Sequence, residues 1–139
     1  MKITVADLEK LGACTGEIKR WRGLFGDAPV EITAALCEQY PDVDYVWAVH
    51  YLLPPALRAE YQRQLSILRA EYERQCAARR AVCDRQDAAL WAEFECRDRA
   101  AYDRQRAPLW AECERQRVAL WAELRRQEAR LFGTLAERT

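Results

Sequence analysis

Residues 57–75 read LRAEYQRQLSILRAEYERQ and contain two copies of one short unit. Near-copies follow as LWAEFECR, LWAECERQ and LWAELRRQ at residues 90–97, 109–116 and 120–127. Most neighbouring units start eleven residues apart, and eleven residues close about three α-helical turns at roughly 3.67 residues per turn. Each unit therefore places the same residue types on the same face of a helix. The repeat predicts that most of the chain is a long repetitive helix.

The repeat also predicts a continuous apolar stripe along that helix. Its units start at residues 57, 68, 79, 90, 98, 109, 120 and 131. The fourth position after each start holds Tyr61, Tyr72, Cys83, Phe94, Tyr102, Cys113, Leu124 and Leu135. These two repeat positions lie about 40 degrees apart on a helix, so their side chains form one stripe.

Because such a stripe is not stable in water alone, something must cover it. A second copy, a fold-back of the chain into a helical hairpin or bundle, and a partner protein are the alternatives, and the repeat spacing favours the first. We therefore expect an all-α protein in which a small N-terminal helical head precedes a long repetitive helix that forms a coiled-coil-like homodimer, or else a helical hairpin. The residues expected to mediate self-association are Leu57, Tyr61, Leu68, Tyr72, Leu90, Leu109, Leu120 and Leu131.

Three features argue against an uninterrupted helix. The step from residue 90 to residue 98 is three residues short of the repeat. Pro108 has no N–H to donate to the carbonyl of residue 104. Residues 76–88 carry the weakest apolar stripe. Each feature is a candidate for the turn of a hairpin, and together they predict a kink or break near residues 84–108.

Residues 1–53 are expected to form the small helical head domain, and residues 54–139 the repeat helix. Four short helices are expected in the head. The first is capped by Thr4 and stops at Gly12, and the second is capped by Thr15 and ends at Gly26.

The third expected helix carries Ile32, Leu36 and Tyr40 and is terminated by Pro41, and the fourth begins at Asp42 or Asp44. Helical spacing of apolar residues is typical of a buried face. The aromatic residues expected to pack in the head are Trp21, Phe25, Trp47 and Tyr51.

Charge and hydropathy favour a cytoplasmic protein. The 22 basic residues equal the 22 acidic ones, and residues 1–53 carry 5 basic and 8 acidic residues, a charge of −3. This balance gives no basic tail, so we expect no nucleic-acid partner. The first residues, MKITVADLEKLG, lack the apolar stretch of a secretory signal, and no apolar run approaches the roughly 20 residues that cross a bilayer.

Cysteine and histidine usage gives no metal or catalytic site. None of the six cysteines has CxxC spacing, and His50 is the only histidine. In a reducing compartment we expect free thiols that act as small apolar side chains. The five glycines are too scattered for a phosphate-binding loop. We therefore expect no enzyme, no catalytic residues and no cofactor.

The segment VADLEKLGACTGEIKRWRGLFG at residues 5–26, followed by an acidic helix and a Trp-containing one, resembles a small helical module found at the amino termini of phage and prophage proteins. The LWAE units are similar to repetitive helices in uncharacterised proteins of that origin. The resemblance carries over no functional residue.

The leading functional hypothesis is a non-catalytic protein–protein interaction protein, because Trp and Arg are enriched among the side chains that dominate binding energy. Phage origin then implies an inhibitor of a bacterial defence complex, similar to an anti-CRISPR protein. The alternative is a structural or assembly scaffold, or a dimeric helical spacer. The residues expected to bind the partner protein are Trp91, Trp110, Trp121, Arg106, Arg117 and Arg125.

Overall fold

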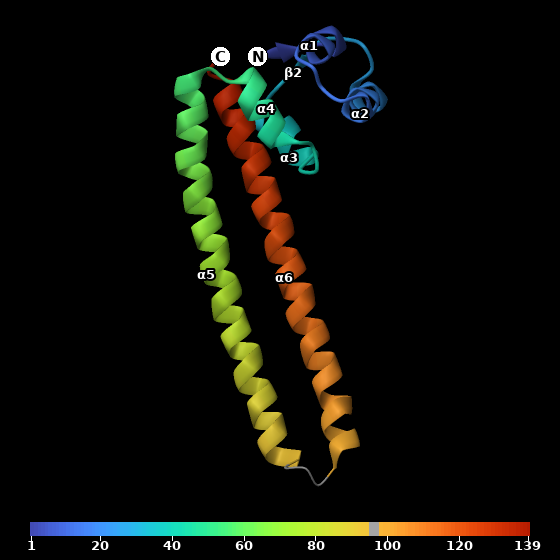
Figure 1. The fold of residues 1–139 in the computed structure, drawn as a ribbon, viewed down its shortest axis with the longest axis vertical. Coiled ribbons are helices and arrows are strands. Elements are labelled where there is room, and N and C mark those ends of the chain that lie inside the picture. The colour runs from blue at the N-terminus through green and yellow to red at the C-terminus, as the bar shows by residue number, and fades with distance from the viewer. Residues whose placement is uncertain (95–97) are drawn as a thin grey trace. The chain divides into compact units, whose positions relative to one another are not determined.

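The computed structural model describes residues 1–94 and 98–139, and the chain forms two compact units. The head unit comprises residues 1–65 and 126–139, and the hairpin unit comprises residues 66–125. The two long helices, which contribute residues to both units, are α5 (Pro55–Phe94) and α6 (Arg99–Ala136) (Figure 1). The shorter elements all belong to the head unit and are β1 (Lys2–Ile3), α1 (Val5–Lys10), α2 (Thr15–Phe25), β2 (Val30–Glu31), α3 (Ala34–Gln39) and α4 (Tyr45–Leu52). The predicted all-α class is confirmed.

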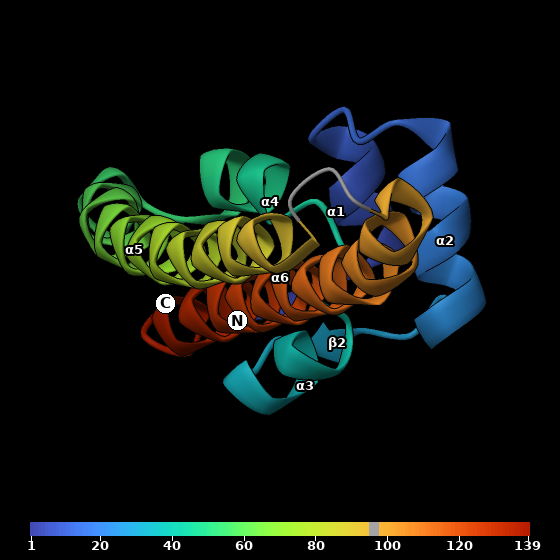
Figure 2. The same ribbon diagram turned by 90° about the horizontal axis from the view of Figure 1, so that it is seen from below.

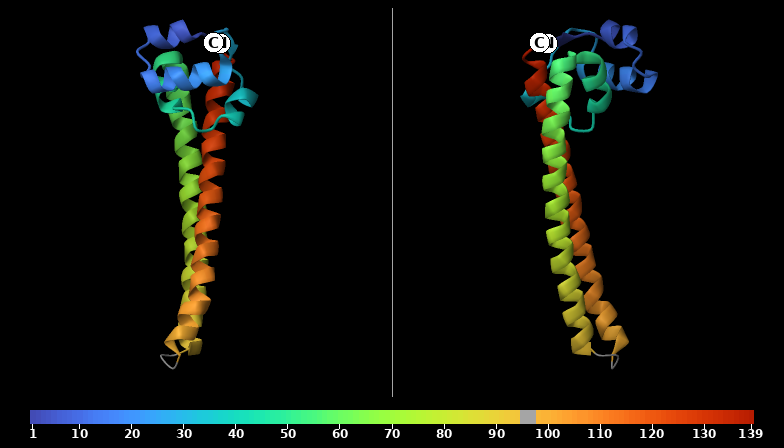
Figure 3. Two further views of the ribbon diagram at one scale, coloured as in Figure 1. Left: turned by 90° about the vertical axis from the view of Figure 1, so that its right-hand side faces the viewer. Right: turned by 60° about the vertical axis from the view of Figure 1, so that its left-hand side comes forward.

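Of the two expected arrangements of the repeat, the structure has the helical hairpin, in which α5 and α6 run antiparallel (Figure 3). α5 ends at Phe94 and α6 begins at Arg99, so the break falls within the short step from residue 90 to residue 98. The other two candidate turns were wrong, because residues 76–88 lie inside α5 and Pro108 lies inside α6. Pro108 is exposed, so solvent can satisfy the carbonyl that loses its helical partner.

Side chains of the predicted apolar stripe are buried in both units. In the head unit, Tyr61 and Leu135 are each 1% exposed, and in the hairpin unit Cys83, Tyr102 and Leu124 are buried. All five occupy the fourth position after a unit start. Among the residues expected to mediate self-association, Tyr61 and Leu131 are buried and the others are half-buried, namely Leu57, Leu68, Tyr72, Leu90, Leu109 and Leu120. The stripe is thus covered largely within one chain, and a homodimer remains a prediction.

The helix ends predicted in the head from capping residues are confirmed at Thr4, Gly12 and Asp44. Thr4 and Asp7 form a reciprocal capping box, with the Asp7 N–H donating to Thr4 Oγ1 over 3.2 Å and the Thr4 N–H to Asp7 Oδ2 over 2.9 Å. Gly12 follows α1 with a φ of +76°, which favours glycine. Asp44, rather than Asp42, caps α4 by accepting a hydrogen bond from the Trp47 N–H over 3.0 Å.

Other expectations for the head were wrong. Cys14 is the N-cap of α2, which therefore starts at Thr15 without a side-chain cap. Ile32 precedes α3, whose N-cap is Thr33. Ile32 is instead buried next to β2, which pairs antiparallel with β1 through Lys2 opposite Glu31 and Ile3 opposite Val30. These two-residue strands are too short to leave an alternating pattern in the sequence.

The aromatic residues of the head pack less completely than their spacing predicts. Trp21, Phe25 and Trp47 are half-buried, whereas Tyr51 is 48% exposed and stacks on Trp47 with ring centroids 5.0 Å apart. Tyr51 was therefore wrongly placed in the core, because the buried face of α4 is formed by Tyr45, Ala48 and Val49.

Helices α3 and α4 of the head unit lie on two sides of the last turns of α6 (Figure 2). On one side, the rings of Tyr45 from α4 and Phe132 lie 5.4 Å apart. On the other, the backbone of Ala34 at the start of α3 approaches Gly133, and the Ala34 N–H donates to Glu137 Oε1 over 2.8 Å. Helix α6 therefore supports both α3 and α4 in the head unit.

Gly133→Ala is expected to destabilise the head unit. The added Cβ would lie 2.5 Å from Ala34 Cα and 2.6 Å from the Thr33 carbonyl oxygen. Both are backbone atoms, so α3 must shift away from α6, and overpacking of this kind costs about 1–3 kcal/mol. Urea unfolding followed by circular dichroism measures the change in the free energy of unfolding.

Gly23→Ala in α2 is the matched control, because its Cβ would meet nothing within 4 Å. This variant should be more stable than wild type by about 0.5–1 kcal/mol, since alanine favours helix. Equal stability of the two variants would contradict the close approach of α3 to α6.

Candidate protein-binding surface of the hairpin unit

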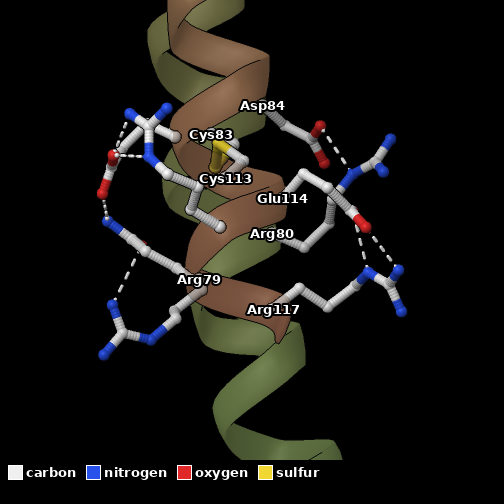
Figure 4. Close-up of a disulfide and its surroundings, with 10 residues drawn as sticks. Arg79, Arg80, Cys83, Asp84, Cys113, Glu114 and Arg117 are labelled. Atoms are coloured by element: carbon white, nitrogen blue, oxygen red, sulfur yellow. Dashed lines mark hydrogen bonds and ion pairs between the residues drawn. A yellow bond between two sulfur atoms is a disulfide. The ribbon is translucent and has the colours of Figure 1, made fainter. Parts of the chain in front are cut away.

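A disulfide between Cys83 and Cys113 joins α5 to α6 in the hairpin unit (Figure 4). The expectation that all cysteines are free thiols was therefore wrong for these two residues. Cys14, Cys37 and Cys76 are free, and Cys96 lies outside the described residues. The disulfide arises because both cysteines occupy the stripe position four residues after a unit start, and the hairpin brings the two stripes together.

Charged side chains flank the disulfide on both sides (Figure 4). Arg79 Nη1 donates to Gln116 Oε1 over 2.9 Å and so links the two helices a second time. Arg80 pairs with Asp84 over 3.0 Å, and Arg117 Nε donates to Glu114 Oε2 over 2.9 Å. A cavity of about 150 Å³ lies beside the disulfide, with Trp110 and Leu120 in its wall.

Trp110 is held by arginine side chains on both helices. The guanidinium carbon of Arg80 lies 4.5 Å from the Trp110 ring centroid, and that of Arg106 lies 5.6 Å from it. Both distances fall within the range of cation–π attraction. Trp110 is half-buried, and its indole nitrogen is buried without a hydrogen-bond partner among the described residues. This tryptophan is therefore largely engaged within the hairpin.

A cluster of polar and aromatic side chains lies between the end of α5 and the start of α6. Asp87 accepts hydrogen bonds from the Tyr102 hydroxyl over 2.9 Å and from Arg106 Nε over 3.1 Å. The rings of Trp91 and Tyr102 meet edge to face at 5.1 Å, and Arg99 lies over both rings. Burial of the Tyr102 side chain and its hydrogen bond to Asp87 both raise the pKa of Tyr102.

Two tryptophans of the hairpin unit are presented at the surface. Trp91 is 41% exposed and Trp121 is 50% exposed. The Trp121 ring rests edge to face on Tyr72 at 5.8 Å, so its orientation is set by the opposite helix. Val118, three residues before Trp121, is 53% exposed and extends this apolar surface.

The six residues expected to bind a partner thus lie in different environments. Trp91 and Trp121 are exposed, whereas Trp110 is enclosed by arginines. Arg106 pairs with Asp87 and Arg117 with Glu114. Arg125 is half-buried and also engaged in an interaction. The structure brings Arg106 and Trp110 together but does not gather all six into one patch.

Sequence reasoning missed Arg80, Arg99 and Asp87, which orient the aromatic rings. A signal for the first was present, because Arg80 and Trp110 occupy the same repeat position, one residue after the unit starts at 79 and 109. The guanidinium of Arg80 reaches across the hairpin to the Trp110 ring. Asp87 and Arg99 carry no such signal, since their role depends on how the chain turns between α5 and α6.

Comparison with protein-family models, with curated proteins and with solved structures gives no match. The resemblance to phage modules therefore remains a prediction from the sequence. Within residues 1–94 and 98–139, no helix is both long enough and apolar enough to cross a membrane.

Replacing both Cys83 and Cys113 with serine is expected to lower the stability of the hairpin unit. The disulfide links residues 30 apart in sequence, and closing a loop of that size is worth about 3–4 kcal/mol in the chain-entropy model. Urea unfolding of oxidised, reduced and doubly substituted protein measures the loss. The exposed Cys14→Ala is the control and should unfold like wild type, because Cys14 makes no side-chain cap hydrogen bond. Coincident curves for oxidised and reduced wild type would contradict the disulfide.

Asp87→Asn is expected to lower the pKa of Tyr102, because it removes the carboxylate that favours the neutral hydroxyl. In wild type the raised pKa contributes stability that is complete below the unfolded value, about 10, and is lost as pH rises through the folded value. An NMR titration of the tyrosine rings measures the pKa of Tyr102 in wild type and in the variant. The Tyr102→Phe variant assigns the resonance. Asp84→Asn, whose carboxylate pairs with Arg80, should leave Tyr102 unchanged.

Proposed function

We propose that this protein is a non-catalytic interaction protein that binds a partner protein through the exposed tryptophan surface of the hairpin unit. This surface is here defined as two separate sites, Trp91 beside Tyr102 and Trp121 with Val118 on α6. The observation that carries the proposal is the exposure of two tryptophans at 41% and 50%. Tryptophan is among the residues most enriched in the energetic centres of protein interfaces.

The two rings are held in place before any partner binds. Trp91 rests against Tyr102, and Trp121 rests against Tyr72 from the opposite helix. A ring that is already ordered loses little conformational entropy on binding, so more of its burial energy contributes to affinity. Arg99 beside Trp91 adds the second residue type that is enriched in binding centres.

The same repeat position already supports helix packing elsewhere in the chain. In the head unit, Phe132 lies one residue after the unit start at 131 and is 2% exposed, packed against Tyr45 of α4. Trp91 and Trp121 occupy the equivalent position in their units. This likeness supports a helix of the partner as the element that covers Trp121 and Val118.

The partner proposed on the sequence resemblance is a bacterial defence complex, which would make the protein an anti-CRISPR-like inhibitor of phage origin. A scaffold or homodimeric spacer is the alternative, and it would use the same surface between two copies of the chain. Oligomeric mass separates the two.

The test is a double variant, Trp91→Ala with Trp121→Ala, used as tagged bait in lysate of the cells that carry the gene. Wild type should recover a partner near one copy per chain after a salt wash. The double variant should retain at least tenfold less, because truncating a central tryptophan typically costs 2 kcal/mol or more. Tyr51→Ala is the matched control, since Tyr51 is a similarly exposed aromatic residue in the head unit.

Sedimentation of the purified proteins completes the test. Under the proposal, wild type and the double variant have the same mass, and only partner recovery differs. A dimer of wild type that dissociates in the double variant would instead establish the spacer. Recovery of the same partner by wild type and double variant would overturn the assignment of Trp91 and Trp121 to the binding surface.

A further inference from the structure

The head unit contains an apolar cavity of about 210 Å³ that its core does not fill. One wall is α2, none of whose side chains is fully buried. Trp21 and Phe25 from this helix meet at 4.7 Å, and Phe25 meets Tyr40 at 5.0 Å, so aromatic rings line one side. Trp47 of α4 and Phe132 of α6 also line the cavity.

The volume of the cavity suits a small aromatic ligand. An apolar cavity of about 150 Å³ in a protein core binds benzene, so a cavity of this size has room for a fused two-ring system such as indole.

The charges that line the cavity are acidic. They belong to Glu17, which is half-buried in the first turn of α2, and to Asp44, the N-cap of α4. No basic residue lines the cavity within the described part of the chain. The nearby Arg20 is not in the wall and instead donates to the Asp42 carbonyl oxygen over 3.0 Å. Carboxylates beside an apolar, aromatic surface attract a cation more strongly than carboxylates in open water do.

We propose that this cavity binds a small aromatic ammonium compound, with its ring between α2 and α4 and its amine toward Glu17 and Asp44. The site lies in the head unit and does not depend on the tryptophan surface of the hairpin unit. It is therefore a second binding function, separate from the proposed capture of a partner protein.

Calorimetric titration of the full chain with three probes tests the charge and the ring together. Tryptamine should bind one to one, indole at least fivefold more weakly, and indole-3-acetate more weakly still, because its carboxylate faces Glu17 and Asp44. Equal affinities for tryptamine and indole-3-acetate would overturn the ammonium assignment. Absence of binding by all three would overturn the site.

Two variants test whether the ligand binds in this cavity. Glu17→Gln should weaken tryptamine binding at least fivefold and leave indole unchanged, because it removes charge while it keeps shape. Ala13→Phe, which fills the cavity wall, should abolish binding of both probes. Ala59→Phe on the exposed side of α5 is the matched control and should bind like wild type. Wild-type tryptamine affinity in both Glu17→Gln and Ala13→Phe would overturn the proposal.

Cysteine alkylation reports binding without calorimetry and confirms that the head is folded. Cys14 lines the cavity and is exposed, so tryptamine should slow its alkylation severalfold. Cys76 in the hairpin unit is the internal control and should not respond. Burial raises the pKa of Cys37 to about 11, so Cys37 should stay unmodified near pH 8 in every variant whose head is intact. Equal slowing of Cys14 and Cys76 would contradict binding at the cavity.

Discussion

The contact between the apolar stripes of α5 and α6 is the constraint on which both units depend. In the hairpin unit it buries Cys83, Tyr102 and Leu124, and in the head unit it buries Tyr61 and Leu135. An eleven-residue period keeps the stripe on one side of each helix, so an antiparallel return of the chain can cover it along its length. The Cys83–Cys113 disulfide and the Arg79–Gln116 hydrogen bond then fix which residues of the hairpin unit face each other.

The residue that follows a unit start packs inside the head unit at Phe132 but is exposed in the hairpin unit at Trp91 and Trp121. In the head unit Phe132 is covered by Tyr45, and Gly133 beside it lets the backbone of α3 approach. In the hairpin unit the equivalent Trp91 and Trp121 are ordered by Tyr102 and Tyr72 but remain exposed. Large exposed aromatic side chains of this kind are typical of interaction surfaces, which is the physical basis for the proposed protein partner.

The candidate site was predictable only where it follows from the repeat. Trp91 and Trp121 are conspicuous in sequence because they recur at one position, yet so does Trp110, which arginines from both helices enclose. The disulfide could have been found, since Cys83 and Cys113 share a stripe position and lie equally far from residue 98, where the repeat is short. The expectation of a reducing compartment led instead to free thiols.

The sequence by itself determined the elements that local chemistry specifies. The capping box of Thr4 and Asp7, the glycine stop after α1 and the long amphipathic helices all depend on residues within a few turns of one another. Tertiary structure decided that the stripe is covered by the chain's own fold-back, that β1 pairs with β2, and that Tyr51 faces outward while Ile32 is buried. These outcomes rest on contacts between residues far apart in sequence, and neither helical periodicity nor capping specifies such contacts.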